Sequence, residues 1–230
     1  MSYGLKVINN SNYVQIDSDT PRLCALYNGT YAATSSYIVS TSFPAPITTT
    51  EPPCVFIRND PARPNEVYYR MDIDGSAGNW TGFTITAGNN TFRPAGKWFA
   101  AVFASLAKAT YGLRIWGASG AICYDSGATP VIVTRANHSW TYQGSVSLTT
   151  IGSAYYFRNE QQAALATDEY FMINPFSRGV LKPQSINWQD CGVRFNYSEN
   201  RLQLYIVDTG AGPWMDQGAP AAVFARLPGT

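Results

Sequence analysis

Few residues in this sequence could do acid–base or nucleophilic chemistry. His138 is the only histidine among the 230 residues. A Ser-His-Asp triad could form only around it, and no Gly-x-Ser-x-Gly segment is present to hold the serine. Because His138 follows Asn137 and precedes Ser139 in turn-like sequence, we interpret it as a surface loop histidine rather than a general base. The sequence therefore predicts no catalytic residue.

Acidic pairs are the remaining source of catalysis, because a glycosidase needs two carboxyl groups that face each other. The tight pairs are Asp168 with Glu169 and Asp72 with Asp74. Neighbours along a strand point to opposite faces, so Asp168 and Glu169 should not converge, although carboxyl groups from separate strands could. A glycosidase stays an alternative. The segment that starts at Asp72 is a poor calcium loop, because Phe83 stands where the closing Glu belongs.

No cofactor or metal is predicted. The four cysteines are far apart and form no Cys-x-x-Cys pair, and with one histidine they do not suggest a zinc site. We expect them to be small buried hydrophobic residues; they are Cys24, Cys54, Cys123 and Cys191. The first residues lack the apolar region of a secretory signal, and the longest apolar stretch, around Trp98–Phe103, is too short for a membrane span.

The nearly neutral net charge argues against partners that are bound mainly through electrostatic attraction. Sixteen Lys and Arg face fifteen Asp and Glu, which leaves a net charge of +1. A nucleic-acid binder gains affinity from a basic excess that is missing here, so we predict no nucleic-acid binding and no membrane insertion. Only 13% of residues are charged and 14% are aromatic, which is typical of an all-β protein with neutral polar faces.

The strongest signal is an internal repeat. Tyr3-Gly4-Leu5-Lys6-Val7 recurs as Tyr111-Gly112-Leu113-Arg114-Ile115, and Asp17-Ser18 recurs as Asp125-Ser126, at a constant offset of 108. Weaker similarities follow in the same order, among them Trp98–Phe103 with Leu202–Val207. We interpret the chain as two tandem, duplicated antiparallel β-sandwich-like domains, residues 1–109 and residues 110–230.

Local patterns assign structure within each copy. Each motif has two short alternating runs around an Asn/Ser or Gly/Ser turn, which predicts a β-hairpin closed by an Asx-type bond from the Asp. The glycine after the tyrosine indicates a bulge or a close backbone approach. Residues 98–103 fit a helical stripe too, but we predict a strand there. Residues 43–46 and 48–53 are rich in proline and predict an extended loop or arm, with a plain surface loop as the alternative. The sequence around residues 159–166 is compatible with short helices.

The six tryptophans have two interpretations, core packing or sugar stacking on an exposed face. Trp116 and Trp214 have no aromatic counterpart in the first copy, and each is next to a turn residue, Gly117 or Pro213. These two are the candidate contact residues.

The repeated motif resembles the opening of a group of structural proteins from the tail genes of long-tailed bacteriophages. That opening runs Y-G-L-x-V-x-N-x-x-G, followed by an apolar strand and D-S. The first copy matches it at Tyr3, Gly4, Leu5, Val7, Asn9, Asp17 and Ser18, with Asn12 in place of the usual Gly. The second copy has Gly120 at that position but Gly117 in place of the Asn. The resemblance covers about fifteen residues per copy and implies no catalytic residue.

The resemblance implies a non-enzymatic part of the tail tip, baseplate or fibre attachment, assembled in the bacterial cytoplasm. Its expected partners are other tail proteins, and a symmetric homo-oligomer or multi-copy assembly is expected. The alternatives are a tail protein that binds a host receptor or surface glycan, a head-decoration protein, and the glycosidase.

Overall fold

The computed structural model describes residues 6–8, 10, 14–17, 21–63, 65–106, 108–150, 152–177, 180–181, 188–207 and 219–230. These residues form antiparallel strands joined by turns, with one 3-10 turn, η1 (Asn174–Phe176), so the all-β prediction is confirmed. No helix within the described segments has the length and hydropathy to cross a bilayer.

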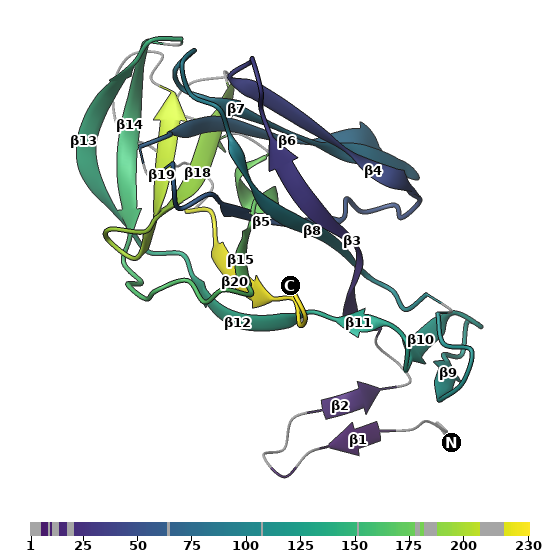
Figure 1. The fold of residues 1–230 in the computed structure, drawn as a ribbon. Helices are drawn as coiled ribbons and strands as arrows, with labels where there is room; N and C mark the ends of the chain where they lie inside the picture. Colours follow the sequence, from purple (N-terminus) through teal and green to yellow (C-terminus); the bar gives the residue numbers. More distant parts are fainter. Residues whose placement is uncertain are drawn as a thin grey trace.

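The strands follow one another along the chain (Figure 1). Their bounds are β1 (Lys6–Ile8), β2 (Val14–Asp17), β3 (Leu23–Ala32), β4 (Ile38–Ile47), β5 (Cys54–Asn59), β6 (Tyr68–Ser76), β7 (Asn79–Ala87), β8 (Ala95–Phe103), β9 (Arg114–Trp116), β10 (Ile122–Asp125), β11 (Thr129–Pro130), β12 (Ile132–Asn137), β13 (Trp140–Leu148), β14 (Gly152–Asn159), β15 (Glu169–Met172), β16 (Val180–Leu181), β17 (Trp188–Gln189), β18 (Cys191–Asn196), β19 (Arg201–Val207) and β20 (Ala222–Arg226).

Three sheets build the body of the molecule. The largest has seven strands in the order β11-β3-β8-β5-β15-β20-β12. A three-stranded sheet, β4-β7-β6, and a four-stranded sheet, β13-β14-β19-β18, complete it. In Figure 1 these two smaller sheets occupy the upper right and upper left of the molecule, with the strands of the large sheet between and below them.

The centre of the large sheet is buried on both faces, as β8 demonstrates. Trp98, Ala100 and Val102 face the main core, which they share with side chains of both smaller sheets. Phe99 and Ala101 point to the opposite face and a second core. A strand covered on both sides needs no polar alternation. This explains why residues 98–103 also fit a helical stripe, and the strand prediction there is confirmed.

The large sheet is strongly curled, so that its two edge strands, β11 and β12, follow one another along the chain. β11 pairs with β3 at one end, and β12 pairs with β20 at the other. Only Val131 separates β11 from β12, and its N–H donates to the Leu23 carbonyl over 2.9 Å. The result is a curled half-barrel, with stacked Phe56 and Phe99 rings, 4.6 Å between centroids, in its second core.

The strand order is similar on either side of residue 109, apart from one additional strand in the second part. The first part supplies β3-β8-β5 and β4-β7-β6, and the second supplies β12-β20-β15 and, with β14 inserted, β13-β14-β19-β18. The two parts are not separate sandwiches, however. β5 pairs with β15, where Ile57 lies opposite Phe171, so one sheet runs through both. The expectation of two self-contained tandem sandwiches is therefore not confirmed.

A side chain also ties the two parts together. Asn59, at the end of β5, donates from Nδ2 to the Phe195 carbonyl over 3.1 Å and accepts the Phe195 N–H at Oδ1 over 2.9 Å. The Tyr197 hydroxyl donates to the Asn59 carbonyl over 2.5 Å. Asn59 and Phe195 are buried. The Asn59 side chain thus supplies hydrogen-bond partners to the Phe195 N–H and C=O groups on the outer edge of β18, where no strand pairs with them.

Two local predictions are wrong. Residues 43–47 of the proline-rich segment belong to β4, because Phe43 and Ile47 are buried in the main core while Pro44 and Pro46 stay at the surface. Residues 160–166 form no helix. The Gln161 N–H donates to Asn159 Oδ1 over 3.0 Å, a local turn that competes with helix formation.

Candidate functional site

The repeated motif folds into the same hairpin twice. In β9-β10, Arg114 lies opposite Asp125, Ile115 opposite Tyr124 and Trp116 opposite Ile122. Every partner in β1-β2 is 108 residues earlier, including the position where the register shifts. The hairpin prediction is confirmed in both copies. β2 also lies against β10, so the two hairpins are neighbours at one end of the molecule (Figure 1).

Asp125 holds the second hairpin together. Its buried carboxylate accepts the Arg114 Nε–H over 2.7 Å and the backbone N–H groups of Ala109 and Gly127 over 3.0 and 2.8 Å. The bond from Gly127 is the predicted Asx-type bond. Burial raises the pKa of Asp125, but the hydrogen bonds from Arg114, Gly127 and Ala109 outweigh it, so the pKa lies below its ordinary value. The Asp is therefore a structural carboxylate.

Gly112 and Ser126 explain two more positions of the motif. Gly112 has a φ of +128°, and a Cβ there would lie 2.1 Å from Ser126 Oγ. Ser126 is fixed from the other side, because its N–H donates to the Leu113 carbonyl over 2.9 Å. In the second copy the glycine therefore leaves room for the Ser126 side chain, whereas its counterpart Gly4 lies outside the described residues. Gly, Asp and Ser thus have folding roles inside the hairpin.

Tyr111 has no such role. Its side chain is 93% exposed, although it opens the repeated motif. Trp116 is 56% exposed, and the Arg114 guanidinium carbon lies 6.0 Å from its ring centroid. Leu113, between them, is exposed too. We call Tyr111, Leu113 and Trp116 the hairpin surface.

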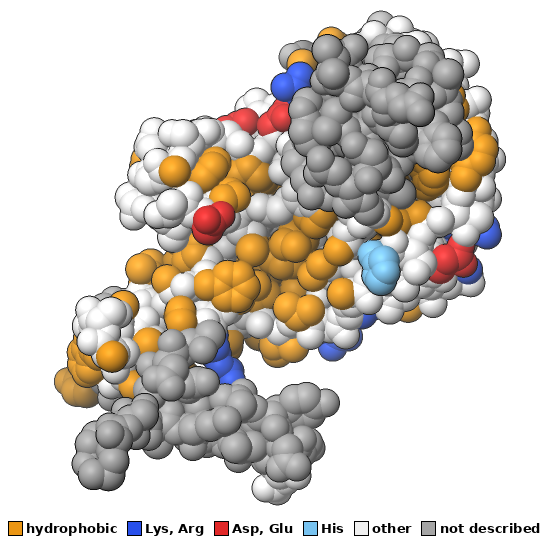
Figure 2. Space-filling view, turned by 180° about the vertical axis from the view of Figure 1, so that it is seen from behind, with side chains coloured by type: hydrophobic (Ala, Val, Ile, Leu, Met, Phe, Trp, Pro, Cys, Tyr) orange, Lys and Arg blue, Asp and Glu red, His pale blue; other side chains and the backbone are white. Residues whose placement is uncertain are grey.

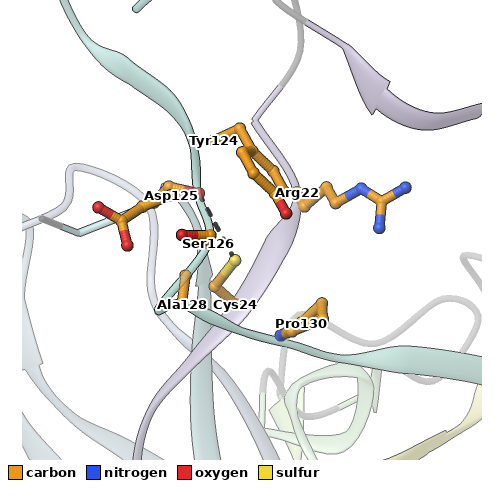
Figure 3. A pocket seen from close by; sticks show the side chains of 8 residues that line it. Arg22, Cys24, Tyr124, Asp125, Ser126, Ala128 and Pro130 are labelled. Carbon is orange, nitrogen blue, oxygen red and sulfur yellow. Dashed lines mark hydrogen bonds between the residues drawn. The ribbon is translucent and has the colours of Figure 1, made fainter. Parts of the chain in front are cut away.

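Shallow hollows flank the hairpin. One of about 360 Å³ lies between β10 and the start of β3, where Arg22, Tyr124 and Ser126 are part of its lining. Figure 3 shows the Arg22 side chain and the Asp125 carboxylate pointing away from each other, and the Asp125 carboxylate is already paired with Arg114.

Phe103 separates two further hollows. It is 66% exposed at the end of β8. With Ile122 and the turn at Gly117 it lines a hollow of about 420 Å³, and with Pro52 it lines a second hollow of about 280 Å³. Sequence reasoning did not single out Phe103, because nothing in the apolar run of β8 marks where burial ends. Hydrophobic side chains gather across the middle of one face of the molecule (Figure 2).

Several predicted residues lie outside the described parts of the chain. These are Tyr3, Gly4, Ser18 and Trp214. Asp17 ends β2, and only its backbone is described. The contact role of Trp214 therefore stays a prediction. Arg114, which the sequence reasoning did not name as a site residue, could have been found from its counterpart Lys6, since both copies carry a cation opposite the Asp.

The acidic pairs are tied to other partners. Glu169 is buried and pairs with Arg135 at 3.2 Å, whereas Asp168 pairs with Arg226 at 3.5 Å, so the two carboxyl groups do not converge. Among the described residues, no group of three or more His, Cys, Asp or Glu side chains is arranged to hold a metal ion.

Asp72 and Asp74 share one face of β6. Asp72 accepts from Arg70 Nε over 2.8 Å, and Asp74 accepts from the Thr84 hydroxyl over 2.8 Å. Burial and the neighbouring Asp72 charge raise the pKa of Asp74, although the Thr84 bond lowers it. His138 is exposed in the turn between β12 and β13 (Figure 2), as predicted.

Comparison with known proteins finds no family model, no curated protein and no solved structure that matches this chain.

Proposed function

We propose that this chain is a non-enzymatic structural protein of a bacteriophage tail, part of the tail tip, the baseplate or the fibre attachment. One observation carries the proposal. The repeated hairpin uses Gly112, Asp125 and Ser126 to fix its own backbone, while Tyr111 and Trp116 stand exposed on it. Rigid aromatic side chains on a preorganised backbone are effective anchors for protein partners.

The two parts of the chain are, in this proposal, duplicated copies of one ancestral unit. The shared hairpin register and the shared strand order support a duplication. Pairing of β5 with β15 joins the two parts in one sheet, and the two hairpins lie side by side. Such an arrangement suits a position between two partners in a symmetric, multi-copy tail assembly.

Labelling of intact particles tests the location. Antibody raised against this chain, with gold detection in the electron microscope, should mark the tail end of particles from the genome that encodes it. Label on the head would favour a decoration protein. Particles that carry no label, although infected cells express the chain, would contradict a virion role altogether.

Variants test whether the hairpin surface makes the contact. Tyr111→Ala with Trp116→Ala should strongly reduce incorporation into particles, because both aromatic anchors are lost while the buried Asp125 network stays intact. Ile38→Ala is the matched control, since Ile38 is 41% exposed on β4, away from the hairpin. Equal incorporation of both proteins would refute docking through this surface.

A receptor-binding role is the second candidate. Trp116 favours it, because a half-exposed indole beside a guanidinium group can stack on a sugar ring and hydrogen-bond its hydroxyl groups. In that case Trp116→Ala particles should assemble normally and fail to attach to host cells. Loss of assembly in the same variant would favour the structural role instead.

A further inference from the structure

The outer edges of the three sheets differ in how they are protected. An unpaired strand edge offers a row of N–H and C=O groups to any other strand, so proteins block such edges with charges, prolines, bulges or covering elements. Within the described residues, the edge strands are β4 and β6 in the three-stranded sheet, β13 and β18 in the four-stranded sheet, and β11 and β12 in the large sheet.

Five of these edges carry a recognisable protection. β4 contains Pro44 and Pro46, and β6 contains Arg70 with Asp72 and Asp74. Asn59 binds the edge of β18. β12 contains Arg135, and β11 has only two residues.

β13 is the exception. Its nine residues, Trp140–Leu148, include no charged side chain and no proline, and no strand of the described chain pairs with its outer edge. The first part is partly shielded, because Gln143 Nε2 donates to the carbonyls of Thr141 and Tyr142 over 3.3 and 3.1 Å, and the register shifts before Gly144. Gly144 belongs to this irregularity, with a φ of +123°, and residues 145–148 have neither device.

The free segment is also held in place. At its end, the Thr149 N–H and hydroxyl both donate to Asn89 Oδ1, over 2.6 and 3.0 Å. Val146 packs against the small cluster of Leu148, Ala154 and Tyr205. A strand fixed in this way loses little freedom when another strand pairs with it. Figure 1 places β13 at the outer left of the molecule, at the far end from the two hairpins.

We propose that residues 145–147 of β13 pair antiparallel with the same segment of a second copy of this chain, about a two-fold axis at Val146. The sequence Ser145-Val146-Ser147 reads the same in both directions, so this register places Ser145 opposite Ser147 of the second copy and Val146 opposite its counterpart. Neutral hydroxyl pairs and a β-branched pair are favourable across strands, and no like charges meet.

The pairing joins two four-stranded sheets into one continuous sheet. It also brings the Val146 and Leu148 cluster of each copy next to its counterpart, so apolar contact is added to the backbone hydrogen bonds. The contact is isologous, which closes the assembly at a dimer. It shares no residue with the hairpin surface, so it stands independently of the proposed function and is measured without any virion.

The test is the mass of the purified full chain in solution, by sedimentation velocity over a concentration series. Wild type should sediment as a dimer, with twice the chain mass of 25.2 kDa. The variant S145K/S147K places lysine opposite lysine at both flanking pairs. We expect its dissociation constant to rise at least about tenfold, because like charges directly opposite each other destabilise strand pairing.

S145K/S147E is the matched control. It substitutes the same two exposed positions, but in the proposed register each lysine faces a glutamate of the second copy, so the dimer should persist. A mixture of S145K/S147K with S145E/S147E should form mixed dimers for the same reason. Far-UV circular dichroism confirms that each variant is folded.

Three results would overturn the proposal. Wild type that stays monomeric at every concentration leaves no dimer to explain. A folded S145K/S147K variant that dimerises like wild type places the contact on another surface. Loss of the dimer in S145K/S147E as well would exclude the register centred on Val146.

Discussion

The bond pair between Asn59 and Phe195 should carry much of the coupling between the two parts of the chain. In Asn59→Ala, the N–H and the C=O of Phe195 both lose their partners. Both residues are buried, so water has little access to replace the amide. Each buried backbone group left unsatisfied costs about 1–3 kcal/mol, so for two groups we expect a loss of about 2–6 kcal/mol in the free energy of unfolding.

Urea unfolding at neutral pH, followed by tryptophan fluorescence and far-UV circular dichroism together, measures this loss. Asn90→Ala is the control, since Asn90 is an exposed loop residue and should change stability by less than about 0.5 kcal/mol. A loss below about 0.5 kcal/mol in Asn59→Ala as well would refute the argument that this side chain joins the two parts.

Asn59→Asp sharpens the test. The carboxyl group can still accept the Phe195 N–H, but it can donate to the Phe195 carbonyl only when protonated. The folded state therefore raises the pKa of the new carboxyl above its unfolded value of about 3.9. The free energy of unfolding of Asn59→Asp, relative to that of wild type, should be highest below a pH of about 3.9. It should fall as the pH rises toward the pKa of this carboxyl in the folded state. A difference that does not change with pH would contradict this geometry.

Three further outcomes follow from the packing. Gly112→Ala should abolish the hydrogen-exchange protection of the Ser126 amide, because a Cβ would clash with Ser126 Oγ. Gly120→Ala is the control for backbone strain, since Gly120 also has a positive φ (+78°) but no atom lies within 4 Å of the new Cβ, so the protection of the Ser126 amide should be retained. Phe99→Ala should lower the free energy of unfolding by about 3–5 kcal/mol in the urea assay, since its buried ring stacks in the second core. Burial raises the pKa of Tyr197 to about 12. The neutral phenol is therefore favoured in the folded state. Its contribution to the free energy of unfolding is complete below a pH of about 10 and is lost as the pH rises toward the pKa of Tyr197 in the folded state. Tyr197→Phe should consequently lose less stability than wild type over that alkaline range.

The hairpin could be predicted from the sequence because its determinants are local. Turn residues, alternation and the Asp-Ser pair lie within sixteen residues of each other, and the repeat gives each copy a check on the other. Exposure could not be predicted in the same way. Tyr111 and Phe103 look like core residues in sequence, and only the packing of the whole chain leaves them at the surface.

The correspondence of later strands was harder to predict, because β14 interrupts it. The sequence similarity aligned residues 98–103 with residues 202–207, which form β19, whereas the strand order makes β20 the counterpart of β8. A stronger signal was available: residues 100–106 (AAVFASL) and 221–227 (AAVFARL) differ at one position. Even in this nearly identical segment, matching residues do not face the same core, since Ala101 lies in the second core and Ala222 in the main core.

The sequence of β5 indicates that this strand pairs on both of its edges, although it lacks the alternation of polar and apolar residues that is used to predict strands. Val55 and Ile57 face the main core and Phe56 faces the second core, so the strand has no polar side. In a unit that ended at residue 109, β5 would be the exposed edge of its sheet, with apolar side chains on both faces. Such an edge invites pairing, and β15 supplies it, continued by the Ile173 N–H to the Val55 carbonyl at 2.9 Å. An apolar run on both faces of a strand therefore argues for an interior position in a sheet larger than one repeat can build.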